Sequence, residues 1–274
     1  MLSATVDLRI AAPEDVRALR ENWRVSFGDP DDYLDFFFSR RFVPENTLVA
    51  CVNGRVVSQL FLLPALLHTQ DGALRADYLF AAATHPEFRG QGIMAALLSE
   101  TRAFCSDRGK DAIVLLPGSS ALYRYYAACG YETAFFRNRQ TVSRAELARL
   151  AVPVRKEMDT AAVLQTILSC RDGLIWDADA LAYALSEHSA FRGTYASSEN
   201  AFVALSEDEA VCLCAPQDFG ACASLLLELS GQPLFSLTVP ADVPIGTREN
   251  GGMLCSLSNQ PIHLREAFIS FAME

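Results

Sequence analysis

The sequence has few of the features that mark nucleic-acid-binding or membrane-embedded proteins. It contains 23 basic against 33 acidic residues, a net charge of −10, and four histidines. Without a basic cluster to displace counterions, binding to a nucleic-acid backbone is excluded as a function class. The longest apolar runs, around 60–63 and 225–227, are much shorter than a bilayer span. We therefore expect no nucleic acid and no membrane among the partners.

Signals for export and for a metal site are also missing. Residues 1–7 show no basic segment followed by a long apolar one, so we expect no signal peptide and a cytoplasmic protein. Eight cysteines occur, none of them in a Cys-x-x-Cys pair. Cys212 and Cys214 alternate along a predicted strand and share one face. The sequence favours buried free thiols over a zinc site or a disulfide framework, and we expect no metal.

The most informative segment is a glycine-punctuated loop between the apolar run 78–83 and a helical pattern that begins near Ala95. It consists of Arg89, Gly90, Gln91, Gly92, Ile93 and Met94. The first N–H groups of a helix lack partners and carry partial positive charge, so such a junction favours phosphate binding. Two glycines let a pyrophosphate approach the backbone, and the arginine adds a fixed charge.

Two other phosphate-binding loops do not fit this segment. No Lys-Ser/Thr pair closes a P-loop, and Ala95 stands where the dinucleotide fingerprint needs its third glycine. A second motif follows the apolar run 112–116, where Tyr126 precedes Gly130 at the end of a short helical pattern. Gly130 is predicted to end that helix in a left-handed conformation. For Tyr126, core packing and a catalytic role are both open.

Together these motifs resemble the GCN5-related N-acetyltransferase (GNAT) superfamily. The loop is similar to its acyl-CoA loop, Arg/Gln-x-x-Gly-x-Gly/Ala, except that Met94 stands where Gly or Ala is usual. A bulky residue there is also found in the Eis-like branch of the superfamily. The second motif is similar to the superfamily's turn, aromatic-Tyr-x-x-x-Gly-Phe/Tyr. The resemblance covers about residues 3–145.

The resemblance implies an enzyme that transfers an acetyl group from acetyl-CoA, a co-substrate, to a primary amine by direct attack in a ternary complex. Backbone groups at Ala83 and Thr84 would bind the pantetheine arm where the sheet splays after Ala83. The loop from Arg89 to Met94 would hold the pyrophosphate. Tyr126 would protonate the departing thiolate, a role that suits a phenol because it stays protonated at neutral pH.

The general base is left open by the sequence. Many relatives use a glutamate early in the fourth strand, where this chain has Tyr78 and Phe80. Asp77 is the nearest carboxylate, but strand alternation directs it to the face opposite Tyr78, and a surface charge is the competing interpretation. An ordered water, or the terminal carboxylate at Glu274 as in some Eis-like enzymes, is a rival.

The element pattern predicts an α/β protein, with α+β character and a mixed sheet. Strands are expected over 5–10, 47–52, 55–70 with a break at Pro64, 74–83, 111–116 and 132–141, and helices over 13–27, 30–38, 91–108 and 121–128. This is the GNAT order. After a linker, helices are expected over 160–168, 177–189 and 219–229, and strands over 200–205, 210–215 and 234–239.

The length predicts two domains. We expect a GNAT domain over 1–145 and a degenerate GNAT-like domain without a phosphate loop over 155–274. This is similar to the tandem Eis-like arrangement without its sterol-carrier-like domain. Residues 266–271 resemble the closing strand of shorter relatives.

Other functions stay open. A non-catalytic acyl-CoA sensor would keep the loop without needing Tyr126. An acyltransferase with another acyl donor or a hydroxyl acceptor is the other alternative, and the small side chains of 81–83 would leave room beside the thioester for a different acyl group. An acidic surface would concentrate a cationic small-molecule amine. The acceptor itself and a homo-oligomeric state are not decided by the sequence.

Overall fold

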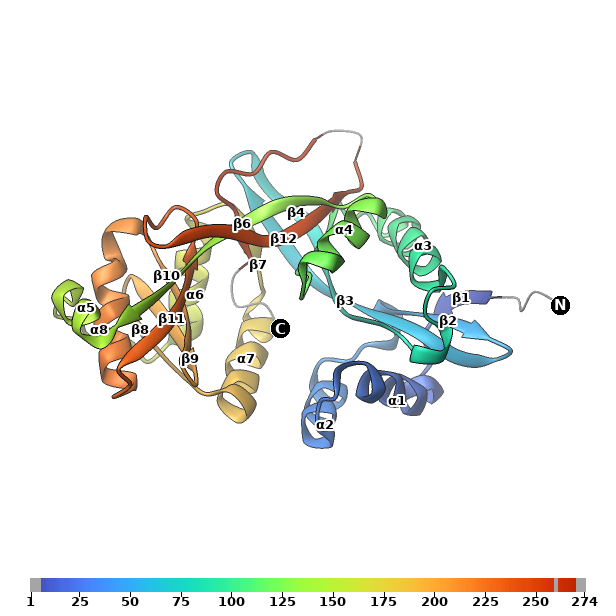
Figure 1. The fold of residues 1–274 in the computed structure, drawn as a ribbon. Helices are drawn as coiled ribbons and strands as arrows, with labels where there is room; N and C mark the ends of the chain where they lie inside the picture. The colour runs from blue at the N-terminus through green and yellow to red at the C-terminus, as the bar shows by residue number, and fades with distance from the viewer. Residues whose placement is uncertain (1–5, 259–260, 270–274) are drawn as a thin grey trace.

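The computed structural model describes residues 6–258 and 261–269, and in it thirteen strands form one continuous mixed sheet. Figure 1 shows two halves joined along this sheet, each with helices packed on it. The α/β fold class expected from the sequence is thus confirmed. No helix in the described ranges is both long and apolar enough to cross a membrane.

The first half has the element order that the sequence predicts. Its elements are β1 (Val6–Ile10), η1 (Pro13–Asp15), α1 (Val16–Phe27), α2 (Asp31–Arg40), η2 (Pro44–Asn46), β2 (Thr47–Val52), β3 (Arg55–Thr69), β4 (Gly72–Thr84), η3 (Pro86–Phe88), α3 (Ile93–Asp107), β5 (Ala112–Leu115), α4 (Ser120–Ala128) and β6 (Glu132–Ser143). The glycine-punctuated loop therefore connects η3 to the first turn of α3.

The second half contains more elements than the sequence predicts. They are α5 (Arg144–Leu150), α6 (Thr160–Ser169), β7 (Gly173–Ile175), α7 (Ala178–Glu187), the π-helix η4 (His188–Arg192), β8 (Thr194–Ser198), β9 (Ala201–Ser206), β10 (Glu209–Cys214), η5 (Pro216–Asp218), α8 (Phe219–Leu229), β11 (Leu234–Pro240), β12 (Thr247–Ser256) and β13 (Phe268–Ile269). Helix α5 and strands β7, β8 and β12 were not predicted. The predicted closing strand is described only to Ile269.

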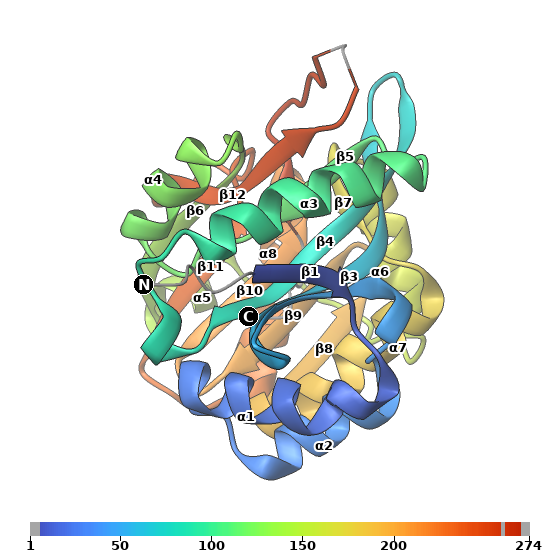
Figure 2. The ribbon, with the colours of Figure 1, turned by 90° about the vertical axis from the view of Figure 1, so that its right-hand side faces the viewer.

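The two halves share strands rather than meeting at a simple boundary. The sheet order is β1-β2-β3-β4-β5-β12-β6-β11-β10-β9-β8. Strand β12 comes from the C-terminal part of the chain, yet it lies between β5 and β6 of the first half. Strand β6 pairs with β12 and, further along, with β11 of the second half. Figures 1 and 2 show β6 and β12 running together across the molecule.

A strand–helix–strand unit occurs once in each half. In the first, β4, η3 and α3 lead to β5, which pairs with β4 in parallel. In the second, β10, η5 and α8 lead to β11, which pairs with β10 in parallel. The second unit passes from η5 directly into α8 without an intervening glycine loop. This repeat is the arrangement expected for a GNAT-like second half.

One predicted break is wrong, because β3 continues through Pro64. Pro64 pairs with Asp77 of β4 on one side. On its other side, pairing with β2 ends at Phe61 and pairing with β7 begins at Leu66. Proline lacks an N–H donor, so it is tolerated in a strand where that edge has no neighbour.

The two faces of the first-half sheet have different cores. Tyr78 and Phe80 of β4 pack with Trp23 and Phe37 of α1 and α2 on one face. Leu79 packs against α3 and α4 on the other face. This alternation decides which β4 side chains reach each side of the sheet. All eight cysteines are free thiols, most of them buried as predicted, with Cys170 exposed.

Candidate active site

Strands β4 and β5 separate near the middle of the first half. Their parallel pairing covers three positions and ends where Tyr78 faces Val114. Beyond this pair, β4 continues to Thr84 and pairs only with β3, which lies on its other edge. The splay therefore begins at Tyr78, earlier along β4 than the predicted position after Ala83.

A β-bulge follows directly in β4. Ala83 pairs with Gln59 and Phe80 pairs with Phe61, so Ala81 and Ala82 both lie opposite Leu60. Ala81 has a φ of +45°, a conformation that residues with side chains rarely adopt. Bulges break the regular hydrogen-bond ladder and occur often beside active sites. The run of small side chains, Ala81 to Ala83, is the sequence signal that accompanies this bulge.

The splay opens into a cavity of about 370 Å³, which is lined by residues of α1, β4, α4 and the end of β5. Its walls are mostly aromatic and apolar, and a single carboxylate lies among them. The lining residues are Trp23, Phe27, Asp29, Tyr33, Tyr78, Leu79, Phe80, Ala81, Ala82, Leu115, Leu116, Pro117, Gly118, Leu122, Tyr126 and Arg137. An apolar cavity with a few polar groups is the usual form of a small-molecule site.

Tyr126 reaches this cavity from α4. Its side chain is buried and its ring contacts the ring of Tyr131 at 5.7 Å. Burial raises the pKa of the Tyr126 phenol to about 12, with smaller contributions from Tyr125 and Cys129. Ser119 caps α4 by accepting a hydrogen bond from the Leu122 N–H, and Gly130 follows with a φ of +88° as predicted. The helix thus holds a protonated phenol at the cavity wall.

The glycine-punctuated loop leaves its backbone open at the other end of β4. Gly90 and Gly92 have φ values of +74° and +76°, and no atom lies within 4 Å of where a Cβ would be. Among the described residues, the backbone N–H groups of Ile93 and Met94 have no hydrogen-bond acceptor. The Ile93 side chain is buried against residues of β2 and β3, and Met94 packs partly against the core. The departure at Met94 therefore leaves its N–H accessible.

Arg89 fastens the loop to the end of β4. Its Nε donates to the Thr84 carbonyl at 2.9 Å, and its Nη2 lies 3.4 Å from the Ser26 hydroxyl of α1. The side chain remains exposed, so its charge stays available beside the open backbone N–H groups. An exposed cation beside free helix N–H groups is a suitable arrangement for an anion.

The two backbone positions predicted at the end of β4 face different ways. The His85 N–H donates to the Val57 carbonyl at 2.8 Å, so these residues form a hydrogen-bonded pair of the antiparallel ladder. Such pairs alternate with non-hydrogen-bonded ones. Thr84, opposite Ser58, therefore points its N–H away from β3 and into the splay. The backbone N–H and C=O of Ala83, opposite Gln59, point toward β3.

Comparison with known proteins agrees with this geometry. Residues 7–134 match the family model of the acetyltransferase (GNAT) domain. These residues therefore form a GNAT acetyltransferase domain. A comparison with curated proteins finds no match.

Solved structures extend the likeness beyond the GNAT domain. A GCN5-related N-acetyltransferase from Kribbella flavida has a TM-score of 0.71 at 17% identity, covering 92% of this chain and 72% of its own. One from Anabaena variabilis has a TM-score of 0.70 at 15% identity, covering 93% and 73%. Eis1 from Mycobacterium abscessus has a TM-score of 0.66 at 14% identity, covering 92% and 74%. At these identities the likeness concerns the fold, and it confirms the Eis-like tandem arrangement.

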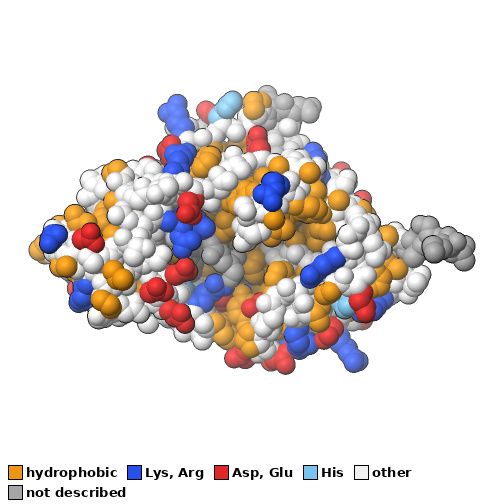
Figure 3. Space-filling model, viewed as in Figure 1, with side chains coloured by type: hydrophobic (Ala, Val, Ile, Leu, Met, Phe, Trp, Pro, Cys, Tyr) orange, Lys and Arg blue, Asp and Glu red, His pale blue; other side chains and the backbone are white. Residues whose placement is uncertain are grey.

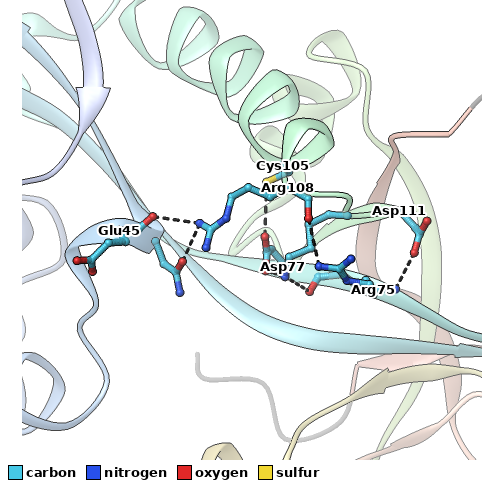
Figure 4. A network of polar contacts seen from close by, with 9 residues as sticks. Glu45, Arg75, Asp77, Cys105, Arg108 and Asp111 are labelled. Carbon is cyan, nitrogen blue, oxygen red and sulfur yellow. Dashed lines mark hydrogen bonds and ion pairs between the residues drawn. The ribbon is translucent and has the colours of Figure 1, made fainter.

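Asp77 lies outside the cavity of the GNAT domain. Figure 4 shows it under the end of α3. Tyr78, the next residue, packs in the core on the opposite face of β4. Its carboxylate is buried, pairs with the Lys110 ammonium and accepts a weak hydrogen bond from the Cys105 thiol at 3.6 Å. The geometry favours neither the predicted base role nor the competing surface charge, because Asp77 is enclosed in an internal ion pair.

The remaining predicted base, Glu274, lies outside the described residues. One carboxylate that the sequence reasoning missed is Asp29, which lines the cavity from the loop between α1 and α2. Its Oδ2 accepts a hydrogen bond from the Trp23 indole N–H at 2.7 Å. The residues Gly28, Asp29 and Pro30 indicate a helix end and a helix start, and that pattern carries no signal for a binding residue.

A second cavity of about 550 Å³ lies between the two halves and shares Leu116 and Arg137 with the first. Its wall in the second half carries mixed charges, including Glu187, Arg192 and the turn 207–209. Figure 3 shows the hollow with hydrophobic side chains on the GNAT-domain side and charged ones on the other. In the described ranges, no group of three His, Cys, Asp or Glu side chains is arranged to hold a metal.

Proposed function

We propose that this chain transfers an acetyl group from acetyl-CoA to a primary amine, by direct attack of the amine in a ternary complex. The observation that carries the proposal is the arrangement of three features along β4. The splay of β4 from β5 gives a slot, the glycine-punctuated loop gives open N–H groups at one end of it, and Tyr126 gives a buried phenol at the other.

The donor would bind along β4. Backbone N–H groups from Gly90 to Met94, together with Arg89, would hold the pyrophosphate of CoA, because free helix N–H groups and a guanidinium both favour phosphate oxygens. The pantetheine arm would lie in the splay, where the Thr84 N–H points. Ala83 would not touch the arm directly, because its backbone carbonyl points toward β3.

The reaction forms one bond and breaks another. The amine nitrogen attacks the thioester carbon, the C–S bond breaks, and the amine loses a proton. Backbone donors at the bulge, Ala81 and Ala82, lie beside the slot and would stabilise the oxygen that gains charge, an effect worth ~3–4 kcal/mol for a good donor. Tyr126 would give its proton to the departing sulfur.

The acceptor side of the cavity fits a cationic amine. Asp29 is the carboxylate in its lining, and the rings of Trp23, Phe27, Tyr33 and Phe80 line the same cavity. An ammonium is stabilised both by a carboxylate and by aromatic faces. Asp29 would bind the incoming ammonium and accept its proton, directly or through water, so that a neutral amine attacks.

We assign the chemistry to residues 1–145 and a shaping role to residues 155–274. Strand β12 completes the sheet beside β5, so the second half supports the slot structurally. The passage into α8 offers no glycine loop and no cation for a second CoA. A second donor site is therefore not part of the proposal.

The test is a calorimetric titration of the protein with acetyl-CoA, with NADH and ATP as controls. We expect selective micromolar binding, followed by release of free thiol when primary amines are screened as acceptors. Binding without thiol release for any amine or alcohol would favour the sensor alternative. Thiol release only with hydroxyl acceptors, or only with longer acyl-CoAs, would favour an acyltransferase with a different acceptor or a different acyl donor. No binding to any acyl-CoA would contradict the proposal.

A further inference from the structure

Three buried polar side chains lie near the end of β4: Asn22 and Gln59 meet between α1 and β3, and Ser58 lies on the opposite face of β3. Asn22 of α1 and Ser58 and Gln59 of β3 are each at most 2% exposed. The Ser58 hydroxyl donates to the Ala83 carbonyl at 3.0 Å, and the Asn22 amide lies 3.4 Å from the same oxygen. Two side chains from different elements therefore converge on one backbone carbonyl.

Folding stability does not account for this cluster. Among the described residues, Asn22 Oδ1 and Gln59 Nε2 are buried without a hydrogen-bond partner. The amide contact between Asn22 and Gln59 is long, at 3.3 Å. Leaving a polar atom buried and unpaired costs about 1–3 kcal/mol, so apolar residues of similar shape would serve the core at least as well. A role at Ala83 is the explanation that the contacts support.

The Ala83 carbonyl and the Thr84 N–H belong to the same peptide unit. That unit is trans, since the described residues contain no cis peptide bond, so its C=O and N–H point in opposite directions. The β3 ladder directs this carbonyl toward Gln59, and the contacts from Ser58 and Asn22 add to that hold; together they fix the Thr84 N–H toward the splay. Donors on a carbonyl also polarise the peptide and strengthen its N–H as a donor.

We infer that Asn22 and Ser58 are positioning residues for the acyl-CoA donor: they hold the Ala83 carbonyl so that the Thr84 N–H is presented to the amide-bearing pantetheine arm. The inference rests on the proposed function. Ser58 also contacts the Thr84 hydroxyl at 2.9 Å, which fixes that side chain away from the arm. The two residues act through the peptide and touch no reacting atom.

The test separates the arm of the donor from its nucleotide. Ser58→Ala, Asn22→Ala and the wild type are titrated with acetyl-CoA and with 3′-phosphoadenosine 5′-diphosphate, which carries the pyrophosphate but no pantetheine arm. We expect each variant to weaken acetyl-CoA binding about fivefold to twentyfold, as expected for one misdirected hydrogen bond, with the affinity for the arm-less nucleotide unchanged. Thermal melting shows whether each variant is folded.

Thr101→Val is the matched control, because the buried Thr101 hydroxyl donates to Leu97 within α3, away from the slot. It should lower stability and leave both affinities unchanged. Unchanged acetyl-CoA affinity in both variants overturns the inference, and so does an equal loss for both ligands, which would indicate a general structural effect. If the wild type does not bind acetyl-CoA, the proposed function fails first and this inference fails with it.

Discussion

The carboxylate of Asp77 and the ammonium of Lys110 form a buried ion pair beside the last position at which β4 and β5 pair. Their side chains are 4% and 12% exposed. Arg75 and Asp111 add backbone and side-chain hydrogen bonds nearby, so the start of β5 is fastened to β4 at several points (Figure 4). The strands are thus held together just before they separate.

Replacing Asp77 with asparagine should therefore lower stability rather than stop chemistry. Asn keeps the shape but leaves the Lys110 charge buried without its partner, which costs about 3–5 kcal/mol in the free energy of unfolding. Turnover of the folded fraction should stay near the wild-type value, as measured by thiol release below the melting temperature. Asp111→Asn, at a more exposed site, is the control and should cost less. A large fall in turnover with stability intact would restore Asp77 as the base.

Gly92→Asp should abolish acetyl-CoA binding, because it adds bulk and a negative charge where phosphate would lie. The variant also forces a side chain into a positive φ, which costs some stability. Gly54→Asp is the matched control: Gly54 has a φ of +77° against +76° for Gly92, and neither has an atom within 4 Å of the Cβ position. Both variants should melt earlier, and calorimetry should show lost binding for Gly92→Asp alone. Equal binding by the two would remove the phosphate role from the loop.

Much of this loop and of the first half could be predicted from the sequence, because local periodicity and glycine positions determine them. Helix α8 was predicted with its observed bounds for the same reason. Strand β12 could not be predicted. Its exposed, polar start and its two glycines, Gly251 and Gly252, hide the strand pattern, and its place between β5 and β6 depends on long-range pairing. Likewise, Asp29 reaches the cavity only through the packing of α1 against α2.

Tyr126→Phe should reduce turnover by ~10²-fold or more with little change in acetyl-CoA affinity, because it removes a proton donor and keeps the ring. Tyr131→Phe is a close control. Tyr131 is buried against Tyr126, and its hydroxyl has no hydrogen-bond partner among the described residues. That variant should keep full turnover. If Tyr126→Phe is fully active in steady-state assays, the phenol serves packing alone.

The pH profile should reflect the raised pKa of Tyr126. At the ordinary pKa of about 10, half of the phenol would be ionised at pH 10, whereas at about 12 only about 1% would be. We expect kcat, which reports the ternary complex, to rise as the bound ammonium loses its proton and to show no fall between pH 8 and 10. A descending limb near pH 9 that disappears in Tyr126→Phe would contradict the raised pKa of Tyr126. The raised pKa also makes the free energy of unfolding depend on pH. The contribution of the buried neutral phenol to stability is complete below pH 10 and is lost as the pH rises through about 12.

Asp29→Asn tests the acceptor side of the cavity. Asparagine keeps an oxygen that can accept the hydrogen bond from the Trp23 indole, so the loop should retain its shape while the charge is lost. The KM for a cationic primary amine should rise about tenfold or more, as expected for loss of a charged hydrogen bond, with the acetyl-CoA affinity unchanged. Asp32→Asn is the control, since Asp32 is exposed on α2 and does not line the cavity. Equal KM values for the two variants would mean that the amine is bound elsewhere, and the charged wall of the cavity between the halves would then be the place to look.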